Sequence, residues 1–151
     1  MYYDDFTPYE YAYTGEEVPR PFNIGWLSSS RPFSTGETTE EFKERLFELS
    51  KLRFEQTRGY QICEFCWGWK RLVQPQPGRS TFVVSPQVTE QRGEVVLRLG
   101  SAEIRVQGLN GKVYAAPNLI YHNVVKHRYK PPEEFIHAVC NLPQTLKPLE
   151  D

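Results

Sequence analysis

The sequence of 151 residues lacks an excess of either charge, a long hydrophobic run and a rich set of cysteines. Its 18 basic and 19 acidic side chains give a formal net charge of −1, and this balance argues against a nucleic-acid-binding protein, which normally carries a basic excess. Its apolar runs are far shorter than the ~20 residues of a membrane-spanning helix, and its first residues are acidic and aromatic, unlike a signal peptide. Three cysteines do not make a disulfide framework. We therefore expect a cytoplasmic protein that binds neither nucleic acid nor membranes.

The sequence also lacks the common catalytic motifs, including G-x-S-x-G, H-E-x-x-H and a glycine-rich phosphate loop. The remaining candidates for acid–base chemistry are weak: His122, which titrates near neutral pH, its neighbour Tyr121, and Glu103. Glu103 and Arg105 alternate with apolar residues, so we expect them on the solvated face of a strand or in an ion pair. No catalytic residue is indicated, and the balance favours a protein that is not an enzyme.

Aromatic residues make up 14% of the chain and are dense at its N-terminus. Residues 1–37 are rich in Tyr, Phe, Pro, Gly and Ser and show no sustained helical or strand period. A disordered arm would be poor in aromatic residues, so we expect an ordered strap with a short strand over Asn23–Leu27. Residues 38–151 are then expected to form a single domain.

Three segments have the apolar spacing of amphipathic helices. A capping box of Thr38 and Glu41 predicts the start of a helix over 39–54. Pro117 suits the first turn of a helix over 117–128, and the pair Pro131-Pro132 precedes a helix over 132–142. The short link between the last two predicts a helical hairpin.

Between these helices the apolar pattern is that of β-strands. Strands are expected over 60–63, 81–85, 94–99, 102–107 and 112–115. Gly100-Ser101 reads as a hairpin turn, Asn110-Gly111 as a second turn, and 87–93 as a polar connector. The predicted fold is α+β: a central antiparallel meander covered by the first helix and the helical hairpin. The apolar faces predict these buried residues: Phe42, Leu46, Leu49, Ile104, Val106, Leu119, Ile120, Val124, Phe135, Ile136 and Val139.

One long motif resembles a family of small bacterial proteins of unknown function. The stretch from Leu99 to Val139, LGSAEIRVQGLNGKVYAAPNLIYHNVVKHRYKPPEEFIHAV, matches the family's "GEIRV" strand and its "YxAPxLIYHYVxxHxYxPPxEFIxAV" segment. The upstream CEFC resembles the family's CxFC pair, and Asn123 stands where the family has an aromatic residue. The resemblance implies a compact bacterial domain and carries no catalytic residue with it.

Cys63 and Cys66 are the most distinctive feature of the sequence. A C-x-x-C pair can provide half of a tetrahedral zinc site, cycle as a dithiol, or be part of the core. No second C-x-x-C exists, so zinc would need other ligands, to be drawn from His122, His127, His137, Cys140 or a carboxylate. His137 and Cys140 are favoured, because residues three apart share one side of a helix. His122 and His127, about 140° apart on one helix, are not expected to bind one ion together unless the helix ends between them.

Three functions remain open. The leading one is a non-enzymatic domain that acts by binding another protein, immunity- or adaptor-like by analogy, with Trp67 and Trp69 as candidate contact residues. The second is a zinc-stabilised module built on the CEFC pair, although a chain of this length can form a core without metal. The third is a small enzyme centred on His122.

Overall fold

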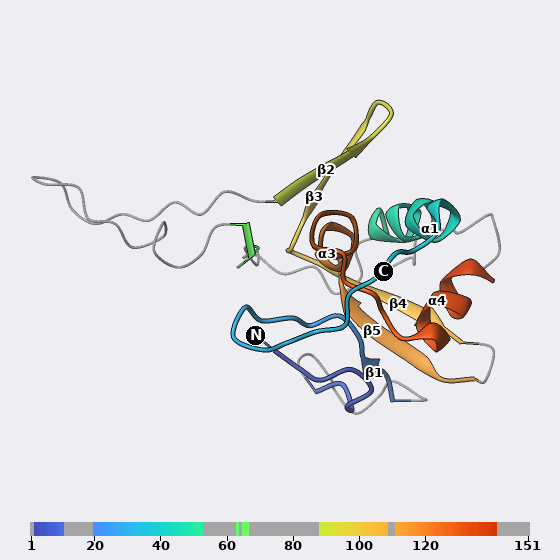
Figure 1. Cartoon of the computed structure of the whole chain (residues 1–151). Helices are drawn as coiled ribbons and strands as arrows, with labels where there is room; N and C mark the ends of the chain where they lie inside the picture. Colours follow the sequence, from blue (N-terminus) through green and yellow to red (C-terminus); the bar gives the residue numbers. More distant parts are fainter. Residues whose placement is uncertain are drawn as a thin grey trace, which may run out of the picture.

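The computed structural model describes residues 2–10, 20–52, 63, 65–66, 88–108 and 111–141 (Figure 1). In chain order, the elements are β1 (Phe22–Asn23), α1 (Glu40–Ser50), β2 (Val88–Arg92), β3 (Val95–Leu99), β4 (Glu103–Gln107), β5 (Val113–Pro117), α3 (Ile120–His127) and α4 (Glu133–Cys140). The predicted α+β class is confirmed. The predicted strands over 60–63 (Cys63 apart) and 81–85, and both Trp67 and Trp69, lie outside the described residues.

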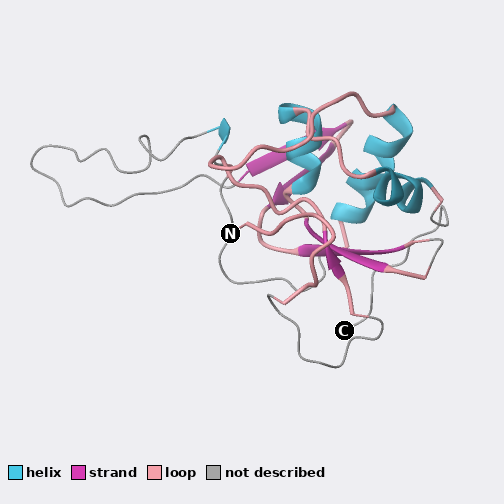
Figure 2. Cartoon of the chain, turned by 60° about the horizontal axis from the view of Figure 1, so that its bottom comes forward, coloured by secondary structure: helices cyan, strands magenta, loops and turns pink. Residues whose placement is uncertain are grey.

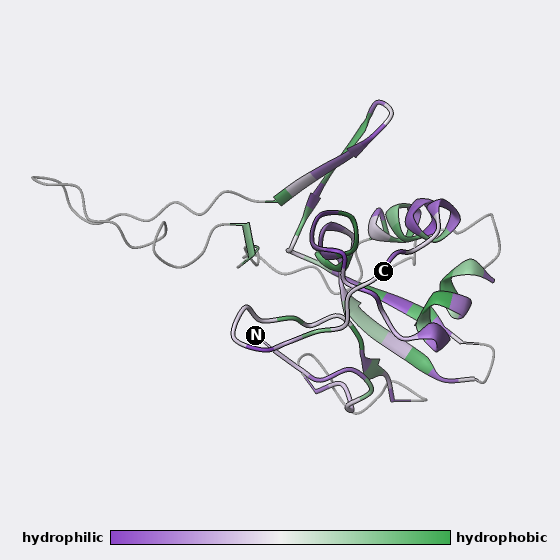
Figure 3. Ribbon diagram, in the orientation of Figure 1, coloured by the Kyte–Doolittle hydropathy of each residue, from purple (hydrophilic) through white to green (hydrophobic). Residues whose placement is uncertain are grey.

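The helices form where the sequence predicts them, with shorter bounds. Helix α1 is capped by Thr39, whose hydroxyl oxygen accepts a hydrogen bond from the Phe42 N–H at 3.1 Å, so Thr39 and not Thr38 is the N-cap. Pro117 ends β5 instead of opening α3, which begins at Ile120. Arg128, with a φ of 58°, ends α3 in the left-handed region. Both α1 and α4 contain hydrophobic and hydrophilic residues interspersed along the helix (Figure 3), as expected for helices with one buried face.

A three-stranded sheet of order β1-β5-β4 supports these helices. Strands β4 and β5 are antiparallel, with Val106 opposite Tyr114, as the sequence predicts. Strand β1 lies at the start of the predicted 23–27 segment and pairs with β5 in the parallel sense. Helices α1 and α4 pack on β4, and α1 also contacts α3; Figure 2 shows the helices gathered on one side of this sheet.

The other face of the sheet is covered by the N-terminal segment, the part of the chain before α1, to which Tyr9 and Trp26 belong. Ala115 of β5 packs there with Tyr9 and Trp26, and the Trp26 indole N–H donates to the Ala115 carbonyl oxygen at 3.1 Å. Glu103 and Arg105 of β4 lie on this face, with side chains 4% and 7% exposed, and form an ion pair of 2.7 Å. The ion pair was one of two expectations for these residues; the solvated face was the other, and it is wrong because the N-terminal segment covers them.

Strands β2 and β3 form a separate antiparallel hairpin, with Val88 opposite Leu99 and Arg92 opposite Val95. The sequence predicts a polar connector over 87–93 and a hairpin turn at Gly100-Ser101, and both predictions are wrong. The backbone turns at Gly93 (φ 60°), and Gly100-Ser101 instead leads from this hairpin to the other sheet. The predicted single meander is therefore two sheets, and β2 contacts α3 (Figure 1).

The hydrophobic core lies between the helices and β4 and β5. Ten of the eleven residues predicted to be buried are so, and Ile136 is partly buried against the same cluster. Phe135 is fully buried, and its ring makes edge contacts with the rings of Phe42 and Tyr114, at centroid distances of 6.4 and 6.0 Å. Helices α1 and α4 and strand β5 therefore meet at Phe135.

Candidate metal centre

Four side chains from two distant parts of the chain meet beside helix α3. The ligand atoms of Cys63, Cys66, His122 and His127 all lie within 4.8 Å of one another. The Cys63 sulfur is 3.2 Å from Nε2 of His127, and the Cys66 sulfur is 3.3 Å from Nε2 of each histidine. Two sulfur and two nitrogen donors therefore face a common point.

Helix α3 supplies both histidines. His122 lies in its first turn and His127 is its last residue. Their positions are about 140° apart on an ideal helix, yet their ring centroids are 5.0 Å apart. Cys63 and Cys66 approach from the other segment, where Phe65 and Cys66 are helical; Cys63 is buried and Cys66 is exposed. The x₂ spacing lets both sulfurs turn toward the helix.

A carboxylate and an aromatic ring flank the four donors. Oε2 of Glu90, in β2, lies 2.6 Å from Nδ1 of His122, and both side chains are less than a tenth exposed. The ring of Phe65 packs on the rings of His127 and Phe33, with centroid distances of 5.2 and 5.1 Å respectively. Metal-binding histidines commonly have such an outer partner on the second ring nitrogen, together with an apolar surround.

Burial disfavours charge on two of these donors when no cation is present. It raises the pKa of the Cys63 thiol to about 11. Burial, followed by the neighbouring His122, lowers the pKa of His127. The attacking thiol of a redox-active dithiol has a lowered pKa, so the raised pKa of Cys63 does not suit it to that role. A bound cation reverses this preference, because a coordinating thiol is deprotonated outright.

The four donors fit a tetrahedral zinc ion. Zinc bonds of about 2.3 Å to sulfur and 2.0 Å to nitrogen, meeting at tetrahedral angles, place sulfur and nitrogen about 3.5 Å apart. Three of the four sulfur–nitrogen distances, at 3.2–3.3 Å, are close to that value, and the fourth is within 4.8 Å. Hydrogen bonds join such atoms only in pairs, whereas one cation can accept a lone pair from all four.

All four residues that the structure brings together were among the predicted ligand candidates, but the favoured pair is not in the group. Cys63, Cys66 and His122 are in the group, but Cys140 and His137 of α4 are not. His137 is exposed and lies 3.9 Å from Glu133. His127, which the helical angle argued against, completes the set, and it is the last residue of α3. The signal that would have found it is the spacing C-x₂-C with H-x₄-H, which is typical of Cys₂His₂ zinc sites.

The three catalytic candidates do not form one site. Glu103 accepts hydrogen bonds from the Tyr9 hydroxyl at 2.8 and 3.0 Å on the opposite face of the sheet. The Tyr121 hydroxyl accepts a hydrogen bond from Arg92 at 3.1 Å. His122 is engaged by Glu90 and Cys66. Each candidate thus has its own partners, and the geometry assigns none of them an acid–base role.

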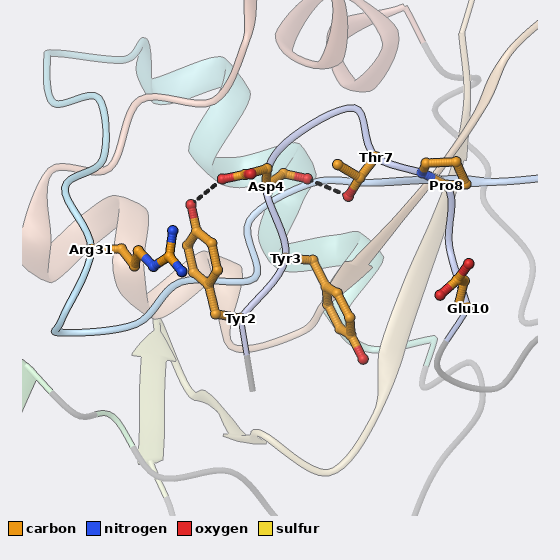
Figure 4. Close-up of a pocket in the computed structure, with 7 residues that line it drawn as sticks. All are labelled: Tyr2, Tyr3, Asp4, Thr7, Pro8, Glu10 and Arg31. Carbon is orange, nitrogen blue, oxygen red and sulfur yellow. Dashed lines mark hydrogen bonds between the residues drawn. The ribbon is translucent and has the colours of Figure 1, made fainter.

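A hollow of about 370 Å³ lies on the N-terminal segment (Figure 4). Its charged groups are engaged with their own neighbours: the Tyr2 hydroxyl donates to Asp4, and the Arg31 guanidinium lies 5.1 Å from the centre of the Tyr2 ring. The Thr7 hydroxyl donates to the Asp4 carbonyl oxygen at 2.6 Å. None of the four metal-ligand candidates lines this hollow.

The fold and the site define an α+β domain with a candidate Cys₂His₂ centre. A family model described as "Domain of unknown function (DUF7919)" matches residues 1–140, and the chain belongs to this family. The predicted membership of an uncharacterised family is thereby confirmed. No curated protein and no solved structure matches the chain. Among the described residues, none of the helices has the length and apolar character needed to cross a membrane.

Proposed function

We propose that this chain is a zinc-binding domain in which a closed Cys₂His₂ centre ties the CEFC segment to helix α3. The observation that carries the proposal is the convergence of four ligand atoms, all within 4.8 Å of one another. The chain around them has the features of a built site: a buried carboxylate on His122 and an aromatic ring against His127.

The choice of zinc follows from the ligand types. Two thiolates and two imidazoles in tetrahedral arrangement suit zinc, whereas magnesium and calcium prefer oxygen ligands. The cation would supply the positive charge that the buried Cys63 needs in order to ionise. Cys63, Cys66, His122 and His127 would be its ligands, and Glu90 would hold the ring of His122.

The expected role of the metal is structural. Catalytic zinc sites keep one position open for water or substrate, and structural sites are closed by four protein ligands. All four donors here come from the protein, and the other two acid–base candidates, Tyr121 and Glu103, hydrogen-bond to Arg92 and Tyr9. A closed set of ligands therefore fits a zinc-stabilised module, one of the functions predicted from sequence, better than it fits a His122-centred enzyme.

Elemental analysis of the full chain, purified without chelator and supplied with zinc, tests the proposal. We expect about one zinc ion per chain, and its loss in Cys63→Ser and Cys66→Ser. Cys140→Ser is the matched control, because Cys140 is the third cysteine and lies outside the group; it should keep the metal. A wild-type chain that binds no zinc, or a Cys66→Ser variant that binds it fully, would contradict the proposal.

A further inference from the structure

The hydrogen bond from His122 to Glu90 determines which ring nitrogen faces the sulfurs. A carboxylate can only accept hydrogen bonds, so Nδ1 of His122, 2.6 Å from Oε2 of Glu90, carries the proton. Nε2 is then left with a free lone pair, and it is this atom that lies 3.3 Å from the Cys66 sulfur. Glu90 thus holds His122 in the one tautomer that can bind a metal at this position.

Glu90 does not belong to the segments that supply the ligands. It lies in β2 of the β2–β3 hairpin, which forms a two-stranded sheet separate from β1-β5-β4. A two-stranded hairpin alone is marginally stable, and Val95 and Val96 near its turn are 41% and 55% exposed. The position of this hairpin therefore depends on the contacts that its inner face makes with the rest of the fold.

The apolar part of that face is Val88, Leu97 and Leu99, which are buried in the hydrophobic core. Its polar contacts with α3 are made by two residues of β2, Glu90 and Arg92, and Lys126 of α3 also lies 4.0 Å from Glu90. Glu90 contacts His122, and Arg92 donates to the Tyr121 hydroxyl at 3.1 Å and to Glu40 at 2.8 Å. The hairpin is thus attached to two consecutive residues of α3, one of which is a ligand candidate. Among these contacts, the hydrogen bond between His122 and Glu90 joins the hairpin directly to a ligand candidate.

We propose that the β2–β3 hairpin is a metal-responsive element, with Glu90 as the positioning residue that couples its docking on α3 to occupation of the metal centre. The proposal rests on the proposed function. A cation on Nε2 withdraws electron density from the imidazole and makes Nδ1–H a stronger donor to the carboxylate. Because coupling between two equilibria is reciprocal, a docked hairpin raises the affinity for zinc by the factor by which zinc favours docking.

Zinc affinity, measured by competition with a chromophoric chelator, gives the first test. Glu90→Gln keeps the shape of the side chain and removes its charge, and we expect zinc to bind about 10–100-fold more weakly. Glu94→Gln makes the same chemical change at the exposed end of the same hairpin and should change the affinity less than about 2-fold.

Hydrogen exchange of the backbone amides of β2 and β3 gives the second test. In the wild-type chain, removal of zinc should raise the opening constant of the hairpin, and in Glu90→Gln this response should shrink by the same factor as the loss in affinity. A purely structural role of Glu90 would raise hairpin opening equally with and without zinc. That result would overturn the coupling.

The tautomer of His122 gives a test that needs no variant. Long-range ¹H–¹⁵N correlation spectra of the zinc-loaded chain should show a protonated Nδ1 on His122, and metal on Nε2. An unchanged zinc affinity in Glu90→Gln would refute the proposal while leaving the zinc centre intact. A protonated Nε2 in the zinc-loaded chain would refute it by removing His122 from the ligands, because a protonated nitrogen has no lone pair for the metal. A wild-type chain without zinc would refute the proposed function first, so the two failures are distinguishable.

Discussion

Zinc should stabilise the folded chain, because only the folded state presents all four ligands together. The close sulfur–nitrogen pairs join residues 56 to 64 positions apart in the sequence. In the unfolded chain Cys63 and Cys66 stay near each other, but closing a loop of about 60 residues to reach the histidines costs about 4 kcal/mol of chain entropy. Zinc therefore binds the unfolded chain much more weakly than the folded one.

The size of the stabilisation follows from mass action. Free zinc at about 100 times its Kd stabilises a folded protein by about 2.7 kcal/mol. In a chain of 151 residues, each kcal/mol moves the Tm by about 2–4 °C. We therefore expect the Tm to rise by about 5–11 °C between chelated and zinc-saturated conditions.

Thermal melts followed by circular dichroism in metal-buffered solutions measure this effect. Above the Kd, the Tm should increase with the logarithm of the free zinc concentration. Cys140→Ser should keep this response, and Cys66→Ser should lose it. A Tm that does not depend on free zinc in the wild-type chain would refute the reasoning, as would a full response in Cys66→Ser.

Two further predictions concern the core and the N-terminal segment. Phe135→Ala should lower the free energy of unfolding in urea by about 3–5 kcal/mol, because it empties a fully buried site; Ile136→Ala, at a partly buried neighbour, should cost less, and equal losses would contradict the assigned face. Asp5 accepts hydrogen bonds from the Gly25 N–H and the Tyr129 hydroxyl, and burial raises the pKa of its carboxyl. The folded state therefore favours protonated Asp5, and this contribution to stability is lost as the pH rises through the raised pKa. Metal-free wild type should accordingly lose stability relative to Asp5→Asn as the pH rises above the ordinary carboxyl pKa of about 4, and a difference that is constant with pH would contradict this.

The helices and the central strands could be predicted because their apolar faces point to one core. The periods of α1, α3 and α4 and of β3, β4 and β5 are visible in the sequence, and the structure has elements at these places. The caps were less predictable: adjacent Thr38 and Thr39 both suit an N-cap, and only the backbone geometry selects Thr39.

Strand β2 could not be recognised, because its inner face is partly polar. Glu90 and Arg92 occupy inward positions that an apolar residue usually fills, so the alternation that marks a strand is missing from 87–93. Their partners, His122 and Tyr121, lie about 30 residues further along the chain. Polar contacts of this kind have no local signature.

Two features depend on segments that meet only in three dimensions. A solvated strand face was one of the two expectations for Glu103, and its burial depends on Tyr9 of the N-terminal segment. The choice of His127 over Cys140 depends on where α3 ends and on how the CEFC segment approaches it. The expectation that another protein binds this domain stays a prediction, since Trp67 and Trp69 lie outside the described residues.

X-ray absorption at the zinc edge of the zinc-loaded full chain tests the central claim most directly, because it counts the ligand atoms around the metal. The Cys₂His₂ centre predicts two sulfur atoms at about 2.3 Å and two imidazole nitrogens at about 2.0–2.1 Å. A shell of five or six oxygen or nitrogen atoms without sulfur, or a sulfur count that Cys63→Ser and Cys66→Ser leave unchanged, would contradict it.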